Sequence, residues 1–503
     1  MTLGYISIGL TVLIVLALTI SRTSKTWLYY LGIYLIGGCL ILSTTLASSQ
    51  LIGTDVNVEY YFSRMVILNG WDTSLNNSFN SSMPITVLAP LLSGYSESNL
   101  IWVYKIVFPL LFACAPVLLL YIYSRFMPIK TAFLSSFIFI IVPTYLLEMP
   151  QIARQMVSEL VLVGIVALLI SKIDHKWKML YVLICSLIII ASHYSMATFL
   201  FVILFVATIG YLRYDKEKWR ALDLAIILIL SIGCFYGYSH WVASGWQVED
   251  MANATKILTD SIVSGGIASG NVQSNPISIN WLHVVLVLGL AYGVYQMIVD
   301  KKNPGIYKLW IIMAFSMLLV SIIYPSISSS INFTRYYHLM LIFLAPAVVY
   351  TFKRATIRTT TTLAIIVFII SSGLLFNLMR IDNIEYPNIP YSIALENKRL
   401  DAGNYLTDTD DDAARWAYEN GIEEIYCDLG GNAALEHYYP MRELKMMGDF
   451  SPGTYIFFRE WNNNTLTYAI TNGVGLRKQI PFPDSLECDI IFQTGNSLIA
   501  RVK

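Results

Sequence analysis

The sequence predicts a polytopic α-helical membrane protein of about twelve transmembrane helices, followed by a small exterior α/β domain at its C-terminal end. Hydrophobic residues make up 56% of the 503 residues and charged residues only 13%. The mean hydropathy is +0.59, which lies outside the range of soluble globular proteins. Apolar runs recur along residues 1–380 and stop in residues 381–503, so the chain divides into a multi-pass membrane domain and a soluble tail.

Each apolar run has the length needed to cross a bilayer, on the order of 20 residues. The runs lie at 3–21, 27–47, 101–123, 130–147, 156–171, 178–192, 195–212, 221–239, 281–299, 309–325, 336–352 and 360–379.

The charges of the loops orient the predicted helices, because Lys and Arg in short loops stay on the cytoplasmic side. If the first helix ends inside, most loop cations between the runs also lie inside. The outer loops then contain only Arg64, Lys105, Arg154, Lys256 and Arg335. This pattern predicts a multi-pass cell-membrane protein whose two termini, loops 48–100 and 240–280, and tail are exterior.

The tail has the signals of a small α/β unit. The acidic run Asp408–Asp412 and the stop residue Gly421 predict a helix over roughly 411–420. Strands are predicted at 422–427, 454–458, 488–492 and 497–502. The acidic run lacks the Gly and the terminal Glu of a calcium loop, so a helix cap is favoured over a metal site.

Two cysteines, Cys427 and Cys488, lie in the predicted exterior tail. An oxidising compartment permits a disulfide there, but two cysteines alone do not decide between a disulfide and free thiols. The net charge of the chain is zero and no basic cluster lies outside, so no nucleic-acid partner is expected.

The first candidate site residues are Asp55 and Glu59. They are four residues apart, and in a helix they share one face. An acidic pair held at a membrane face is a functional-site hypothesis. The competing interpretation is that Asp55 only caps the helix and that Glu59 is solvated.

A second group lies between the fourth and fifth predicted helices, where Glu148, Arg154 and Glu159 flank a short outer turn. An isolated Arg beside lipid is costly, so Arg154 requires a carboxylate or a phosphate as its partner. A structural ion pair with Glu159 or Glu148 and an anion-binding role are both consistent with this pattern.

Further candidates occupy two other outer helix ends. His193 lies in the tight turn Ser192–Ser195, where it either binds a phosphate or a sugar hydroxyl or is satisfied by a neighbour. Arg335 and His338 are three residues apart on one helical face, with Tyr336 beside them. This group suits a lipid phosphate, and an interfacial anchor is the alternative.

The layout of these residues resembles the GT-C superfamily of polytopic glycosyltransferases, which use polyprenyl-phosphate-linked sugars. In that superfamily a carboxylate lies in the first long exterior loop, at the start of a membrane-parallel helix, and Asp55 occupies that place. The chain also resembles a mainly archaeal group of multi-pass proteins with four short motifs. These read here Gly53–Tyr61, Ala153–Met156, Ser192–Ser195 and Arg335–His338.

The resemblance implies a membrane glycosyltransferase that moves a sugar from a polyprenyl (dolichyl-type) phosphate to a glycan, protein or lipid acceptor at the outer face. Asp55, with Glu59, is then the catalytic carboxylate, and Arg154 and Arg335 hold the donor phosphate with support from His338 and His193. Glu148 and Tyr336 complete the predicted substrate site. The exterior membrane loops lack a clear Asp-x-Asp motif, so no cofactor is certain and a divalent cation stays an open option. The tail is expected to assist acceptor recognition without supplying the chemistry.

The residue pattern leaves two other classes of function open. One is a lipid-linked-sugar flippase or other membrane transporter, and the other is a structural or sensory membrane protein. Transporters favour charged or broken helices near the bilayer midplane, often in matching halves. Here the ionisable residues gather at outer helix ends and no repeat is visible, which favours chemistry on a lipid-borne donor.

Overall fold

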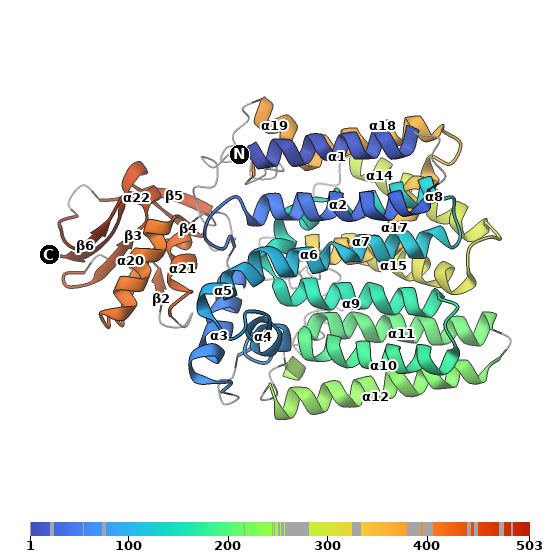
Figure 1. The fold of residues 1–503 in the computed structure, drawn as a ribbon, viewed down its shortest axis with the longest axis horizontal. Coiled ribbons are helices and arrows are strands. Elements are labelled where there is room, and N and C mark those ends of the chain that lie inside the picture. The colour runs from blue at the N-terminus through green and yellow to red at the C-terminus, as the bar shows by residue number, and fades with distance from the viewer. Residues whose placement is uncertain are drawn as a thin grey trace.

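The protein consists of a bundle of long helices with a small mixed domain at one end (Figure 1). The computed structural model describes residues 2–20, 25–53, 55–72, 77–215, 217–243, 245, 247–249, 252, 256, 281–323, 333–379, 394–395, 406–439, 444–446, 451–471, 477–483 and 486–503. Most of the predicted loop at 240–280 and the predicted domain boundary near residue 380 lie outside these residues.

The long bundle helices are apolar and run side by side (Figure 1). They are α1 (Thr2–Ile20), α2 (Thr26–Thr45), α9 (Ala153–Ile170), α10 (His175–Ser192), α11 (Tyr194–Tyr214), α12 (Trp219–Trp241), α14 (Trp281–Val299), α15 (Gly305–Ile323), α17 (Phe333–Thr351) and α18 (Ile357–Ser371). The short α19 (Leu374–Leu378) follows α18.

Two further bundle segments are interrupted. The first, Glu97–Ser124, is built from α5 (Glu97–Trp102), the π-helical turn η2 (Val103–Val107), α6 (Phe108–Phe112) and α7 (Cys114–Ser124). The second joins α8 (Ile129–Ile140) to the turns η3 (Thr144–Glu148) and η4 (Met149–Gln151) with a bend of 57°. Pro143 lies in that break, and a proline is a common cause of such a bend.

Within the described residues, eight helices are long and apolar enough to cross a membrane, and nine if the bent pair counts as one crossing. Each of the predicted apolar runs falls on a helix of the bundle. The predicted fold class, a polytopic helical membrane protein with a small C-terminal sheet region, is confirmed.

The early loop forms helices at one end of the bundle. These are α3 (Asp55–Asn69), the π-helical turn η1 (Pro84–Leu88) and the short α4 (Ala89–Leu92). The tail lies at the same end, as does the N-terminus of α1 (Figure 1). We call this the site end of the bundle, and we call the opposite end, where α9 finishes and α10 begins, the pocket end.

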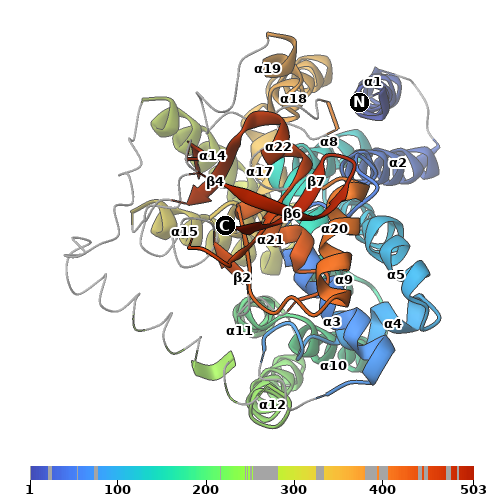
Figure 2. The same cartoon turned by 90° about the vertical axis from the view of Figure 1, so that its left-hand side faces the viewer.

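The tail is a mixed sheet with helices packed on it (Figure 2). Its strands are β1 (Ile425–Cys427), β2 (Leu444–Met446), β3 (Tyr455–Phe458), β6 (Cys488–Thr494) and β7 (Ser497–Val502), in the order β2-β1-β3-β7-β6. The pairs β1–β2 and β1–β3 are parallel, while β3–β7 and β6–β7 are antiparallel. The strands β4 (Thr467–Thr471) and β5 (Arg477–Pro481) form a separate antiparallel pair.

The tail helices are α20 (Asp408–Glu419), α21 (Leu429–Leu435) and α22 (Glu460–Thr465). The acidic run predicted as a helix cap acts as one, because Thr407 and Asp410 form a reciprocal capping box at the start of α20. Cys427 and Cys488 are free thiols, so the disulfide that the sequence left open is not formed. They lie on β1 and β6, and β3 and β7 separate these strands in the sheet.

Candidate functional site

The candidate site is built around the start of α3, where a glycine permits an abrupt turn of the chain. Gly53 has φ +123°, and a Cβ atom there would lie 2.6 Å from the side chain of Gln151. Only glycine adopts this conformation without strain. Asp55 begins the helix directly afterwards, and Glu59 follows one turn later on the same face.

Arg154 reaches both of these carboxylates from the second residue of α9. Its Nη2 atom lies 3.9 Å from Asp55 Oδ2, and its Nε atom lies 3.3 Å from Glu59 Oε1. The guanidinium group also lies 4.0 Å from the ring centroid of Phe79, which is a cation–π contact. The sequence left open a structural ion pair with Glu159 or Glu148 and an anion-binding role, and the carboxylates that Arg154 meets are Asp55 and Glu59 instead of those two. The reason is that α3 folds back over the start of α9, which no local spacing reveals.

Arg335 approaches the same Asp55 oxygen from α17. Its Nη1 atom lies 3.5 Å from Asp55 Oδ2, and its Nε atom lies 3.8 Å from Glu148 Oε2. Thr334 donates a hydrogen bond of 2.6 Å to the same Glu148 oxygen. Two guanidinium groups from helices far apart in the sequence therefore flank one carboxylate oxygen. We call Asp55, Glu59, Glu148, Arg154 and Arg335 the Asp55 cluster.

Glu59 differs from Asp55 in its burial. Its side chain has no exposed surface, whereas 30% of the Asp55 side chain is exposed. Burial raises the pKa of Glu59 to about 8, with Arg154 opposing the shift and Asp55 adding to it. The Ala153 N–H group donates a hydrogen bond of 2.8 Å to Glu59 Oε2. Glu59 is therefore suited to positioning Arg154, while Asp55 is the carboxylate of the pair that is partly exposed.

His193 contributes to the surroundings of the cluster as a neutral side chain. Burial, together with the charges of Arg154 and Arg335, holds the pKa of His193 well below its ordinary value. Its Nδ1 atom lies 2.8 Å from the hydroxyl group of Ser195. A neutral imidazole here can donate or accept a hydrogen bond but brings no charge to a phosphate.

His338 is buried inside the bundle, whereas the sequence placed it at an outer helix end. Its Nδ1 atom is 3.0 Å from Glu159 Oε1, and both side chains are fully buried. Tyr336 is partly buried against the apolar core of the bundle. The structure thus separates Arg335, at the cluster, from His338, which pairs with Glu159 inside the bundle.

The tail supplies contacts to α3 that sequence reasoning missed. His437 Nε2 lies 2.6 Å from Asn57 Oδ1, and the His437 ring is stacked at a tilt on Tyr60 with 5.0 Å between centroids. Arg64 lies over the ring of Tyr438 at 5.2 Å. We call Asn57, Tyr60, Arg64, His437 and Tyr438 the tail contact. The only signal in the sequence is the run His437-Tyr438-Tyr439 in a predicted exterior domain.

His437 is held between a residue of α3 and a residue of α20. The Asn57 side-chain nitrogen donates to the Gly53 carbonyl group, which directs the Asn57 oxygen toward His437 Nε2. Asp411 Oδ1 lies 3.0 Å from the other ring nitrogen of His437. Burial alone would raise the pKa of Asp411, but the hydrogen bonds from His437 and Tyr438 hold it below its ordinary value.

Glu436 brings a further carboxyl group from the tail toward Asp55. Its side chain is buried, and burial raises its pKa to about 8, with the negative charge of Asp55 adding to the shift. A hydrogen bond from the Asn432 side chain opposes this shift. Glu436 therefore holds its proton more tightly in the folded protein than a solvent-exposed Glu does.

An ion pair in the tail core fixes the position of the contact residues. Arg459, after β3, binds Asp428 through two parallel hydrogen bonds of 3.0 Å, and both side chains are buried. Asp428 also caps α21 by accepting from the Gly431 N–H group at 2.7 Å. Because α21 leads directly into Glu436 and His437, this pair anchors the segment that meets α3.

The described residues contain no group of three or more His, Cys, Asp or Glu side chains arranged to hold a metal ion. In the Asp55 cluster, cationic side chains occupy the positions between the carboxylates. The side chains present therefore suit an anionic ligand better than a second cation.

No family model and no curated protein matches the chain. Two solved structures show its similarity to known folds. The oligosaccharyltransferase of Archaeoglobus fulgidus, tethered to an acceptor peptide, is 9% identical, covers 92% of this chain and 74% of its own, and has a TM-score of 0.46. ArnT from Cupriavidus metallidurans, bound to undecaprenyl phosphate, is 11% identical, covers 95% of this chain and 98% of its own, and has a TM-score of 0.38.

Both identities are low and both TM-scores are below 0.5, so these two neighbours carry no argument about the function of this chain.

Proposed function

We propose that the protein is a membrane glycosyltransferase that moves a sugar from a polyprenyl-phosphate donor to an acceptor at the site end of the bundle. One observation carries the proposal: Arg154 and Arg335 both lie within ion-pair distance of Asp55 Oδ2. This arrangement provides a base and two planar cations at one point beside the membrane. A polyprenyl phosphate presents its phosphate at that depth.

The proposed reaction is a single displacement at the anomeric carbon. The acceptor hydroxyl oxygen forms the new bond to this carbon while the bond from the carbon to the phosphate oxygen breaks. Asp55 takes the hydroxyl proton, and the lipid phosphate leaves with the bonding electron pair. Its charge is stabilised by Arg154 and Arg335. One displacement inverts the anomeric centre.

Donor binding also explains how Asp55 becomes available as a base. Without a donor, both guanidinium groups are engaged by Asp55, Glu59 and Glu148. A phosphate competes for these cations through charge-assisted, two-pronged hydrogen bonds. As the phosphate takes over the cations, Asp55 is freed to accept the acceptor proton.

The location of the charges favours transfer over transport. Among the described residues of the long helices, Glu159 and His338 are the one close pair of ionisable side chains in which both members are fully buried. Glu159 is six residues into α9, roughly 9 Å from its start, so the pair lies in the half of the helix near the site end. A transporter site is expected near the middle of the membrane.

We assign the site end to the exterior face, because the predicted loop charges place it there. The tail lies over the same end (Figure 2). We assign to it a role in acceptor recognition, since the tail contact holds the helix that carries Asp55.

Replacing Asp55 with Asn tests the proposed function. The variant preserves the shape of the side chain but removes its basicity, and we expect sugar transfer to fall by about 10²- to 10⁴-fold. Transfer is measured with purified protein and a panel of radiolabelled polyprenyl-phosphate sugars, by following the label into the acceptor fraction. Asp412→Asn is the matched control, because Asp412 is half-exposed in the tail and pairs with Arg415. Transfer at the wild-type rate by folded Asp55→Asn protein would falsify the assignment of the base.

A further inference from the structure

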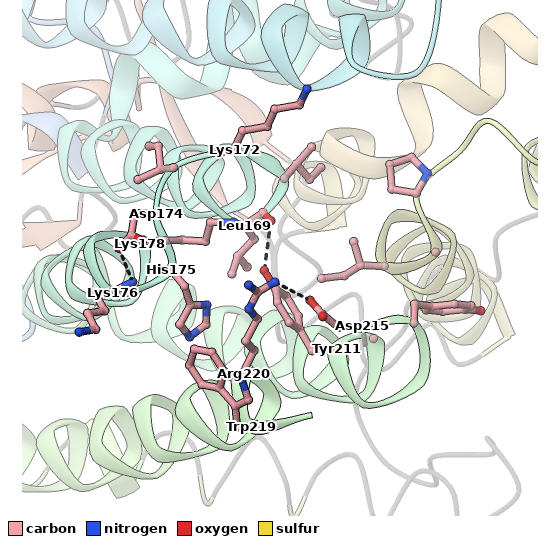
Figure 3. Close-up of a pocket in the computed structure, with 17 residues that line it drawn as sticks. Leu169, Lys172, Asp174, His175, Lys176, Lys178, Tyr211, Asp215, Trp219 and Arg220 are labelled. Carbon is pink, nitrogen blue, oxygen red and sulfur yellow. Dashed lines mark hydrogen bonds and ion pairs between the residues drawn. The ribbon is translucent and has the colours of Figure 1, made fainter. Parts of the chain in front are cut away.

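The pocket end of the bundle contains a hollow of about 680 Å³ (Figure 3). It lies where the ends of α9 and α11 meet the beginnings of α10, α12 and α15. Its inner wall is apolar and includes Leu169, Ile170 and Ile306. The hollow is at the opposite end of α9 from Arg154, so it is separate from the Asp55 cluster.

Cationic side chains surround the hollow. Lys172, Lys176, Lys178 and Arg220 all line it, and Figure 3 labels the four among the lining side chains. Arg220 forms ion pairs with Asp215 at 3.4 Å and with Glu217 at 2.8 Å. Within the part of the chain that the structure describes, none of the three lysines forms an ion pair with a carboxylate, and Lys178 donates only to the Ser171 carbonyl group, at 2.9 Å.

The acidic groups beside the lysines are committed elsewhere. Asp174 accepts from the backbone N–H group of Lys176 and caps α10. His175 lies 2.8 Å from Asp223 and therefore does not add a free cation. Asp215 is engaged by Arg220. The lining thus contains four basic side chains, Lys172, Lys176, Lys178 and Arg220, and two carboxylates, Asp174 and Asp215, which leaves basic groups in excess.

The rim of the hollow is built for a membrane interface. Tyr214 and Trp219 line it and are 52% and 51% exposed, and Ile173 is 42% exposed. Trp and Tyr side chains prefer the level of the lipid headgroups. A ligand here can place an anion among the lysines and an apolar chain along the outside of α10 and α12.

We propose that this hollow binds the phosphate headgroup of an anionic membrane lipid in the leaflet at the pocket end. Basic hollows between membrane helices are suited to such headgroups. The aromatic rim favours a lipid over a soluble phosphate compound, because a soluble ligand gains nothing from exposed Trp and Tyr at the bilayer surface. The proposal is independent of the transfer reaction, since none of its residues belongs to the Asp55 cluster.

The test is lipid binding by the full-length protein in detergent, measured by native mass spectrometry. Dioleoylphosphatidylglycerol is the anionic probe and dioleoylphosphatidylcholine the zwitterionic one. The variant is the double substitution Lys172→Gln and Lys176→Gln, because both side chains are exposed and their loss leaves the core intact. The matched control is Lys301→Gln with Lys302→Gln, two exposed lysines in a loop outside the hollow.

We expect the wild-type protein to prefer phosphatidylglycerol and the Lys172/Lys176 variant to bind it about tenfold more weakly or worse. The control variant should stay within about twofold of the wild type. Equal losses in the two variants would mean that the surface charge attracts lipid without a site, and this outcome overturns the proposal. Equal binding of the two lipids overturns it as well. Displacement of bound phosphatidylglycerol by millimolar inorganic phosphate would assign the hollow to a free phosphate and reject the lipid.

Discussion

Helix α3 has two interfaces that are built from different interactions. Toward the bundle, Asp55 and Glu59 meet Arg154 and Arg335 through ion pairs of 3.3 to 3.9 Å. Toward the tail, Asn57, Tyr60 and Arg64 meet His437 and Tyr438 through a hydrogen bond and ring contacts.

The difference shows that the two faces of α3 are suited to different roles, one to the proposed chemistry and the other to holding the helix in position. Residues 55 and 59 share one helical face, and residues 57, 60 and 64 share another. The charged face contacts groups that a phosphate can displace, because ion pairs exchange one anion for another. The tail face is held by a hydrogen bond and ring contacts, and in the proposed function these keep α3 in place while the ion pairs rearrange.

Conservative substitution at the bundle interface should have the largest effect. Arg154→Lys and Arg335→Lys keep the charge but lose the planar two-pronged group, and Arg154 also loses its contact with Phe79. We expect transfer to fall by about 10- to 100-fold, with much of the loss in the KM for the donor. The measurement is initial transfer rate against donor concentration.

Arg415→Lys is the control for these variants, since Arg415 is half-exposed in the tail and pairs with Asp412. Unchanged donor KM in both cluster variants would remove the phosphate-binding role from these two residues.

Disruption of the tail interface should have a smaller effect. Asn57→Ala and His437→Ala each remove the hydrogen bond between Asn57 and His437. We expect each to slow transfer by roughly three- to tenfold, because Asp55 keeps its partners but its helix loses a support. In a double-mutant cycle the two changes should be coupled by about 1 kcal/mol.

The cycle is measured on both transfer rate and thermal unfolding. Additive effects of the two substitutions would show that the contact contributes nothing. If His437→Ala slowed transfer as much as Arg154→Lys does, His437 would instead belong among the residues that contact substrate.

The smallest expected effect concerns the pH dependence of stability. Glu436 has its pKa raised to about 8 in the folded protein, mainly by burial, whereas an unfolded Glu titrates near 4.3. The folded state therefore binds the proton more tightly, and this contribution to stability is complete below the unfolded pKa. It is lost as the pH rises through the folded value of about 8.

Glu436→Gln keeps the neutral shape and removes this contribution. The wild-type Tm should fall between pH 5 and pH 8 by a few degrees more than the Tm of the variant. Differential scanning fluorimetry in detergent measures the difference, with the exposed Glu419→Gln as the control for loss of a carboxyl group. Parallel pH curves for the wild type and Glu436→Gln would refute the raised pKa.

The local signals of the sequence located most elements of both regions. The start of α3 at Asp55 agrees with the predicted interfacial helix, and α20 begins with the acidic run that was expected to cap it. The four predicted strands correspond to β1, β3, β6 and β7. The strand β2, the pair β4–β5 and the helix α22 were not predicted. These elements are short, so each has too few residues to show the hydrophobic periodicity of a strand or a helix.

The candidate site was located in part. Asp55, Glu59, Glu148, Arg154 and Arg335 were all named from their positions at outer helix ends, and the structure brings them together. The carboxylates that Arg154 meets are not the two that the sequence offered for an ion pair, His338 lies with Glu159 inside the bundle, and the tail residues were missed. Each of these points depends on which helix lies against which.

The sequence by itself determined that the chain forms apolar helices and where ionisable side chains interrupt them. Those properties are local, because the bilayer sets the length of an apolar run and a single cap residue sets a helix start. The tertiary structure alone decided which charges meet. Asp55 lies about a hundred residues from Arg154 and nearly three hundred from Arg335 in the numbering, and Asn57 and His437 are separated by 380 residues. Contacts over such separations follow from the packing of whole helices and domains, which the spacing of residues along one segment does not contain.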